Sequence, residues 1–332
     1  MVEIAPVASP ADWRAADFAG SDEWIDYLSR EDLAELDAAL RHAKSRGVSG
    51  IQVRREDFPL PTLSRRLGNL LDTLIDGRGF ALLRGFPVRD YSEEDAGTIF
   101  WGIGTYLGAP WPQNADGDLL GDVRDTGRSI LDTSVRGYQT NIRLPYHTDA
   151  ADIVGLMCVR AAKRGGISSL VSSVACHNEI ARSRPDLLPR LYQSFYYDWR
   201  EEQPEGEAPY YQMPVFSSES GRMFNRYMRG YIETAQRFKE LPRLTAHERE
   251  ALDYLDGLTE SAAFQLDMEL QPGDMQFINN WVLLHGRTEF EDHEEEGERR
   301  HLKRLWLATD RFEKRPEVFM GLGYDLGWDK AS

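Results

Sequence analysis

The sequence has very little cysteine: only Cys158 and Cys176 among 332 residues. Two isolated thiols exclude a disulfide-stapled scaffold, and they are too far apart for a Cys-x-x-Cys redox or zinc motif. Free thiols are typical of a reducing compartment, so we expect a cytoplasmic protein. Stability must then come from an apolar core, and 41% hydrophobic residues in a chain of this length are enough to build one.

Long hydrophobic runs and an excess of positive charge are also missing. No stretch approaches the ~20 apolar residues that cross a bilayer, and the start, MVEIAPVASPADW, lacks the basic and apolar regions of a secretory leader. The net charge of −16 argues against a general nucleic-acid surface, which needs a basic stripe. We therefore expect neither a membrane nor a nucleic acid as a partner. A small anion is still possible as a ligand, because salt screens distant charges over about 8 to 10 Å.

The chain contains no flexible linker, so we predict a single domain over residues 1–332. Within it, residues 1–77 are expected to be mostly helical and to pack on a sheet. Ser29 is a plausible cap for a helix over 29–47, and leucines at helical spacing predict a second helix over 63–77 and a third from Ser92 to about Leu107. Residues 115–137 have the composition of a long loop, and strands are expected within 156–174 and 266–308.

The segment LPYHTDAAD contains an H-x-D triplet, which is a weak signal by itself, because seven histidines and 55 acidic residues produce such triplets by accident. His147 and Asp149 stand at i and i+2 of an extended segment, so their side chains point to the same face, roughly 6.5 to 7 Å apart. A second candidate, His285, ends the apolar run 277–284 in FINNWVLLHGR. Two histidines and one carboxylate form the facial triad that holds non-haem Fe(II) and leaves positions open for other ligands.

Two other histidines also precede a carboxylate by two residues, His177 and His293. His293 lies in EFEDHEEEGE, which is typical of a solvated loop or a mobile lid, and His177 lies at an expected helix start. His147 and His285 instead follow expected strands and would sit at the rim of a sheet. For any one histidine, ordinary hydrogen bonding is the alternative, and zinc or copper at the same ligands also stays open.

The segment RRHLKRLWL contains closely spaced arginines on an expected strand. Strand alternation places Arg300, Leu302, Arg304 and Trp306 on one face. Two guanidinium groups are costly to bury without an anionic partner, and a bound dicarboxylate would supply one. The alternative is that both arginines pair with the nearby acidic loop or reach solvent.

Together these features resemble the taurine dioxygenase-like family of Fe(II)/2-oxoglutarate-dependent oxygenases, in the clavaminate synthase-like superfamily. The resemblance covers roughly Gly79 to Ala308 and rests on GFALLRGFPV, the H-x-D segment, GGISSLVSS, the distal histidine and the paired arginines, in matching order. It implies a mixed, mainly β fold: a double-stranded β-helix, or jelly roll, with flanking α-helices and an N-terminal helical extension.

The resemblance also implies roles for individual residues. His147, Asp149 and His285 would ligate iron, and Arg300 would bind the distal carboxylate of 2-oxoglutarate. Ser168 stands where the family usually has a threonine that assists that carboxylate, and Arg304 stands where several members hold an anionic group of the primary substrate. Arg299 beside Arg300 leaves the register of the arginines open.

The implied reaction uses Fe(II), 2-oxoglutarate as co-substrate and O2, releases succinate and CO2, and oxidises an unactivated C–H bond of a small anionic substrate. Hydroxylation or desaturation fits Asp149 better than halogenation, because related halogenases lack the carboxylate. A silent relative that only binds a ligand or a partner is the alternative, and a homo-oligomer stays open. The aromatic residues between Leu191 and Tyr231 would line the pocket or form core.

Overall fold

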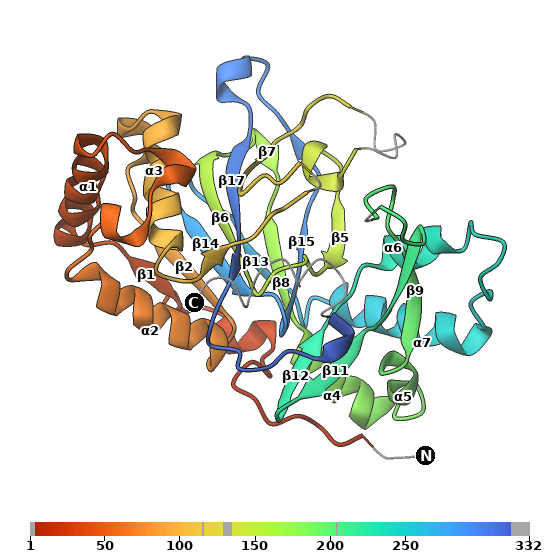
Figure 1. Cartoon of the computed structure of the whole chain (residues 1–332). Coiled ribbons are helices and arrows are strands. Elements are labelled where there is room, and N and C mark those ends of the chain that lie inside the picture. The colour runs from red at the N-terminus through yellow and green to blue at the C-terminus, as the bar shows by residue number, and fades with distance from the viewer. Residues whose placement is uncertain (1–3, 115, 129–134, 204, 320–332) are drawn as a thin grey trace.

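Two β-sheets face each other at the centre of the protein, and helices cover their outer sides (Figure 1). The computed structural model describes residues 4–114, 116–128, 135–203 and 205–319. Within these ranges no helix combines the length and the apolar composition that a bilayer-spanning segment needs.

The larger sheet has seven strands, and all of its pairings except β1–β2 are antiparallel. In spatial order its strands are β1 (Ile25–Tyr27), β2 (Phe80–Arg84), β14 (Met275–Asn279), β6 (Ile153–Arg160), β17 (His301–Ala308) and β3 (Ala109–Pro110), with β4 (Leu120–Val123) also paired to β17. The sequence of β6, IVGLMCVR, is almost continuously apolar because both faces of this central strand are covered.

The smaller sheet has four antiparallel strands. In order they are β13 (Leu266–Met268), β8 (Ser168–Ser172), β15 (Leu283–Arg287) and β5 (Leu144–His147). Further two-stranded pairs are β7 (Arg164–Gly165) with β16 (Phe290–Glu291), β9 (Ser194–Asp198) with β10 (Tyr210–Pro214), and β11 (Phe216–Glu219) with β12 (Arg222–Asn225).

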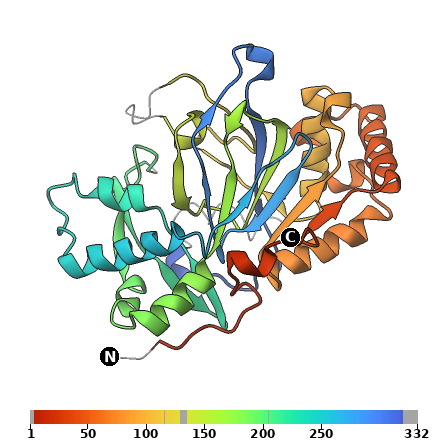
Figure 2. The same cartoon turned by 180° about the vertical axis from the view of Figure 1, so that it is seen from behind.

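The helices fall into two groups on opposite sides of the sheets, as the view from behind also shows (Figure 2). The helices α2 and α3 pack on the larger sheet, with α1 against α3, while α4 packs on the smaller sheet and contacts α5 and α7. The bounds are α1 (Arg30–Ser45), α2 (Leu63–Ile75), α3 (Glu93–Gly104), α4 (Ser173–Ser183), α5 (Leu188–Leu191), α6 (Arg229–Ala235) and α7 (Ala246–Thr259).

Local sequence signals explain where the first helices begin. The Ser29 hydroxyl accepts a hydrogen bond from the backbone N–H of Asp32, whose carboxylate accepts one from the N–H of Ser29, so a capping box starts α1. At the start of α3, the Ser92 hydroxyl likewise accepts a hydrogen bond from the backbone N–H of Asp95. The leucine stripe of α2 is buried against the sheet. The predicted jelly roll with flanking helices is confirmed.

Two details of the predicted elements were wrong. Residues 120–123 form β4, although the polar composition of 115–137 predicted a loop, because this short strand completes an edge of the larger sheet beside β17. Residue 115 and residues 129–134 lie outside the described residues. The apolar run 277–284 is not one strand: it is split by a turn, so that β14 belongs to the larger sheet and β15 to the smaller one.

A buried carboxylate, Asp152, ties the two sheets together just before β6. The side chain is 1% exposed and accepts hydrogen bonds from the indole N–H of Trp281 (2.8 Å), the backbone N–H of Thr309 (2.8 Å) and the Nε of Arg315 (2.8 Å). It therefore joins the start of β6, the turn between β14 and β15, and the segment that follows β17.

We expect Asp152→Ala to lower the free energy of unfolding by about 3 to 5 kcal/mol, because it removes the buried carboxylate that accepts hydrogen bonds from Trp281, Thr309 and Arg315. Urea denaturation followed by circular dichroism measures this. The matched control is Asp72→Ala, since Asp72 also pairs with an arginine, Arg311, but is exposed. There the loss should be below about 1 kcal/mol, and equal losses in the two variants would contradict the role given to Asp152.

Candidate active site

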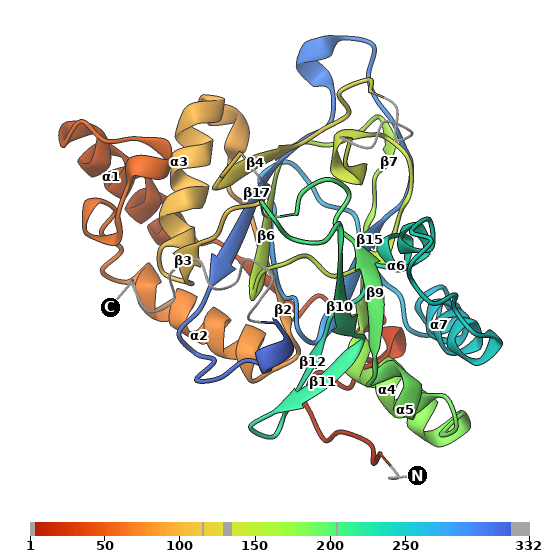
Figure 3. The ribbon, with the colours of Figure 1, turned by 45° about the vertical axis from the view of Figure 1, so that its right-hand side comes forward.

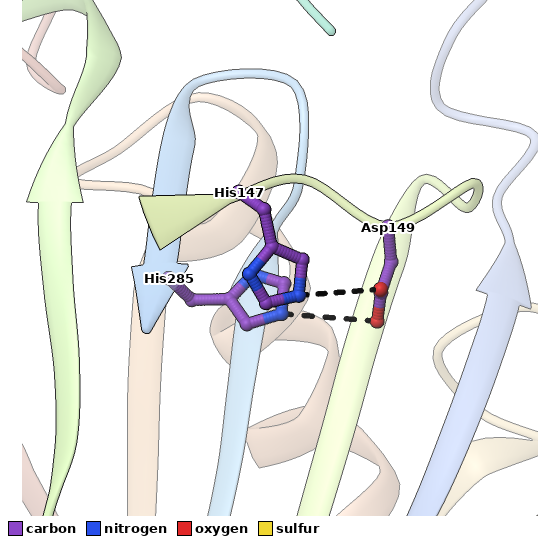
Figure 4. Close-up of side chains that lie close together, drawn as sticks. All are labelled: His147, Asp149 and His285. Atoms are coloured by element: carbon purple, nitrogen blue, oxygen red, sulfur yellow. Dashed lines mark ion pairs between the residues drawn. The ribbon is translucent and has the colours of Figure 1, made fainter. Parts of the chain in front are cut away.

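The three residues of the predicted triad come together between the sheets (Figure 4). His147 ends β5 and lies directly opposite His285 of β15, with the two imidazole centroids 4.3 Å apart. Asp149 belongs to the segment that leaves β5 for β6, and its two oxygens face the two histidines. Its Oδ1 lies 3.7 Å from the Nε2 of His147, and its Oδ2 lies 3.8 Å from the Nε2 of His285.

This arrangement fits a divalent metal ion. Two atoms that each bind one ion at about 2.1 Å are at most about 4.2 Å apart, and both carboxylate–imidazole distances are shorter than that limit. All three donor atoms lie within 4.8 Å of one another. The Nδ1 of His147 is 2.8 Å from the carbonyl oxygen of Pro145, which leaves its Nε2 free to donate a lone pair to a metal.

The charges of the three residues also suit a metal. Burial lowers the pKa of both histidines, that of His285 to about 3, so the imidazoles are neutral and their ring nitrogens available at pH 7. Burial alone would raise the pKa of Asp149, but the positive charge of Arg304, with smaller contributions from the histidines and Trp306, outweighs it and holds that pKa below its ordinary value. Asp149 is therefore ionised at pH 7.

The carboxylate of Asp149 is oriented by residues of β17 and its backbone by Asn280. The indole N–H of Trp306 donates to its Oδ2 at 2.9 Å, and the Nη1 of Arg304 is 3.7 Å from the same oxygen. The side chain of Asn280 accepts a hydrogen bond from the N–H of Asp149 and donates to its carbonyl oxygen.

A cavity of about 400 Å³ extends from the triad between the two sheets. Figure 3 shows β6 and β17 of the larger sheet to one side and β15 of the smaller sheet to the other. The larger sheet contributes Leu156, Arg304 and Trp306 to the wall, and the smaller sheet contributes Tyr146, Ser168 and Arg287.

The structure places every sequence-predicted site residue at this cavity. Arg300 lines it, whereas Arg299 is exposed. The rival histidines lie elsewhere. His177 is buried in α4, where its Nε2 meets the hydroxyl of Tyr192 at 2.9 Å, and His293 lies in the acidic loop before β17.

The glycine pair before Ser168 makes room for Arg300. Gly166 has a φ of +69°, and a Cβ there would lie 2.8 Å from the Nε of Arg300. A side chain at this position would therefore displace the guanidinium. Ser168 is buried, and its hydroxyl donates to the Oε1 of Gln276 at 3.1 Å.

Arg300 and Arg304 differ in their surroundings. Arg304 donates from its Nε to Gln113 at 2.7 Å and stacks on Tyr138, with 4.4 Å from its guanidinium carbon to the ring centroid. The Nη1 of Arg300 is buried without a hydrogen-bond partner among the described residues. Burial lowers the pKa of Arg300 to about 10, which marks a charge that an anionic ligand would stabilise.

Three contributors to the site were not predicted from sequence: Arg287, Trp306 as a partner of Asp149, and Asn280. The position of Arg287 could have been predicted, because it follows His285 by two residues on one strand and alternation puts both side chains on the same face. The contacts of Trp306 and Asn280 with Asp149 bridge distant parts of the chain, and no local pattern reveals them.

Five of the eleven aromatic residues between Leu191 and Tyr231 form core, which was one of the two interpretations. Phe195, Tyr197, Phe216, Phe224 and Tyr227 are each at most 1% exposed. Tyr231, which belongs to α6, lines the cavity together with other residues of that helix.

A jelly roll that presents two histidines and a carboxylate at the mouth of such a cavity belongs to the class of non-haem metal oxygenases. The family model described as taurine catabolism dioxygenase TauD, TfdA family matches residues 39–306. The chain belongs to this family, and it is an Fe(II)/2-oxoglutarate-dependent dioxygenase.

Individual relatives agree with this. FR-33289 synthase of Streptomyces rubellomurinus is 32% identical over 325 residues, which cover 95% of each chain. A taurine hydroxylase-like protein of Stachybotrys chartarum is 31% identical over 308 residues, 90% of this chain and 78% of that one. Among solved structures, asparagine oxygenase with Fe(II), 2S,3S-3-hydroxyasparagine and succinate has a TM-score of 0.66 at 18% identity and covers 89% of this chain and 98% of its own, which shows the common fold.

We expect Trp306→Phe to weaken Fe(II) binding by about ten- to hundredfold, because it removes the hydrogen bond that orients Asp149. Anaerobic titration of the metal-free protein with Fe(II) gives the dissociation constant. Trp24→Phe is the control, since its indole N–H donates to the carbonyl oxygen of Ser21 at an exposed position, and it should bind Fe(II) like the parent protein. Unchanged Fe(II) affinity in Trp306→Phe would show that the contact does not orient the ligand.

Proposed function

We propose that this dioxygenase hydroxylates an unactivated C–H bond of a small anionic molecule, with succinate and CO2 as the products of 2-oxoglutarate. The observation that carries the proposal is the meeting of two neutral imidazoles, an ionised carboxylate and buried arginines in one cavity. The triad supports iron binding, and the arginines support two anions, the co-substrate and the substrate.

In this proposal His147, Asp149 and His285 hold the iron, Arg300 and Ser168 bind the distal carboxylate of 2-oxoglutarate, and Arg304 meets an anionic group of the substrate. Arg300 lacks an anionic partner within the described part of the chain, and Ser168 lines the same cavity with a hydroxyl. Arg304 lies close to Asp149, so an anion at Arg304 would sit beside the metal.

The bound iron and 2-oxoglutarate would supply the oxidising power from O2. The chain's own residues bind and orient. The neutral histidines and the ionised Asp149 offer three donor atoms on one side of the ion and leave the cavity side for other ligands. Val154, Leu156 and Leu302 give the cavity an apolar wall, which excludes water from the reacting carbon.

We also propose that residues 1–332 form one domain and that the protein is cytoplasmic. The two unpaired, buried cysteines support the cytoplasmic location. A homo-oligomer is compatible with the proposal, and small molecules are its only required partners.

We expect His147→Ala and His285→Ala to abolish succinate release, because each removes a metal ligand. Succinate is measured after incubation with Fe(II), 2-oxoglutarate, O2 and a panel of small organic acids and amino acids, which also identifies the substrate. His293→Ala is the matched control, since it alters the rival H-x-E segment outside the cavity. Turnover that survives in either triad variant, with a native circular dichroism spectrum, would remove that histidine from the metal site.

Arg300→Ala and Arg304→Ala should affect different ligands. We expect Arg300→Ala to raise the KM for 2-oxoglutarate by about a hundredfold, because a charged hydrogen bond is worth about 1.5 to 3 kcal/mol. Arg304→Ala should act mainly on the KM of the substrate found in the panel. Steady-state kinetics with each ligand varied in turn distinguishes them, and a reversed pattern would exchange the two roles.

A further inference from the structure

A second buried arginine, Arg287, shares the wall of the cavity with Arg300. Arg287 is 6% exposed and Arg300 is 5% exposed. Both guanidinium carbons lie near the ring of Phe290, at 4.7 Å and 4.9 Å from its centroid. No described carboxylate forms an ion pair with either arginine. Two buried positive charges side by side are unfavourable unless an anion lies between or beside them.

The hydrogen bonds of Arg287 show which of its atoms are available. Its Nη2 donates to the carbonyl oxygens of Thr140 and Ile142, which fixes the guanidinium in place. Its Nε and Nη1 are buried and have no hydrogen-bond partner in the described ranges, and the same holds for the Nη1 of Arg300. Three N–H-bearing nitrogen atoms in one region of the cavity thus lack an acceptor.

The sheet register brings a hydroxyl to the same place. Arg287 of β15 pairs directly with Ser168 of β8, so the two side chains stand on one face of the smaller sheet. Arginine has only donors, so the group that satisfies these atoms must be an acceptor. A carboxylate has two oxygens and about four lone-pair sites, enough to bind two guanidinium groups and a hydroxyl together. The Ser168 hydroxyl has a single proton, so it joins them by turning that proton from the Oε1 of Gln276 to the carboxylate.

We propose that Arg287 is a second arginine anchor for the distal carboxylate of 2-oxoglutarate, acting with Arg300 and Ser168. The inference rests on the proposed function. Two residues of strand, about 6.6 Å, separate Arg287 from the metal ligand His285, a length that the five-carbon chain of 2-oxoglutarate can span from the metal. The carboxylate then completes the hydrogen bonds that Arg287 lacks, while Nη2 keeps the guanidinium against the backbone of residues 140 and 142.

The experiment compares two keto acids that differ only at the distal end. 2-Oxoglutarate carries the distal carboxylate, and 2-oxopentanoate has a methyl group in its place. Each is titrated anaerobically into the Fe(II)-loaded protein, and the weak visible absorption band of the chelate reports binding without turnover. The proteins are the parent, Arg287→Gln, Arg287→Lys and Arg300→Ala.

For Arg287→Gln we expect the Kd of 2-oxoglutarate to rise about ten- to hundredfold, because a hydrogen bond to a charged group is lost. The Kd of 2-oxopentanoate should change less than about twofold, since this acid has nothing for Arg287 to hold. Arg287→Lys keeps the charge but not the fork, so its Kd for 2-oxoglutarate should fall between those of the parent and Arg287→Gln. Arg164→Gln is the control, because Arg164 is exposed on β7 of the neighbouring short sheet, and it should match the parent.

Equal weakening of both keto acids in Arg287→Gln would assign Arg287 a purely structural role through residues 140 and 142, and would overturn the inference. An unchanged Kd for 2-oxoglutarate would also overturn it. If the parent protein gives no band with 2-oxoglutarate, the proposed function itself fails. If the parent binds, Arg300→Ala weakens binding and Arg287→Gln does not, only the role of Arg287 fails.

Discussion

The site depends on how the chain crosses from the smaller sheet to the larger one, in residues 148–152. Buried polar side chains hold this crossing at both ends. Arg226 donates to the carbonyl oxygen of Thr148, and Asn280 bonds to the backbone of Asp149 on both its N–H and C=O sides. Asp152 then anchors the start of β6. Because the backbone is fixed in this way, the carboxylate of Asp149 stays close to Arg304 and Trp306, which help to keep it ionised although it is buried.

Strand periodicity explains why much of this site could be predicted from sequence. The spacing of His147 and Asp149, and the alternation that puts Arg300 and Arg304 on one face, follow from local geometry and hold in the structure. What the spacing could not supply was the partner of each group. The bond from Trp306 to Asp149 and the pairing of β4 with β17 depend on which strands lie side by side, and this is set by the whole fold. The family resemblance predicted the jelly roll and so the general order of its strands, but it did not predict the short polar strand β4.

The net negative charge of the chain is compatible with a cavity lined by arginines, because the two sets of charges affect a ligand over different distances. The net charge of −16 is spread over the chain, where water and salt screen it within about 8 to 10 Å. Arg300 and Arg304 act at hydrogen-bonding distance inside a cavity with an apolar wall, where a charge is screened much less. The two arginines have different interaction partners. Arg304 is held by Gln113 and lies near Asp149, whereas Arg300 is buried without a carboxylate in the described structure.

The division of groups between the sheets links ligand binding to stability. His147 and His285 belong to the smaller sheet. Arg300 directly precedes β17 of the larger sheet, and Arg304 lies within β17. In the proposed function, a 2-oxoglutarate molecule held at one end by the metal and at the other by Arg300 would therefore join the two sheets. The same ligand would relieve the cost of burying the Arg300 guanidinium, a cost that exists only in the folded state. Because it binds the folded chain and not the unfolded one, it would stabilise the fold by an amount that grows with the logarithm of its concentration divided by its Kd. The cavity would thus add a connection between the two sheets, beside the one made by Asp152.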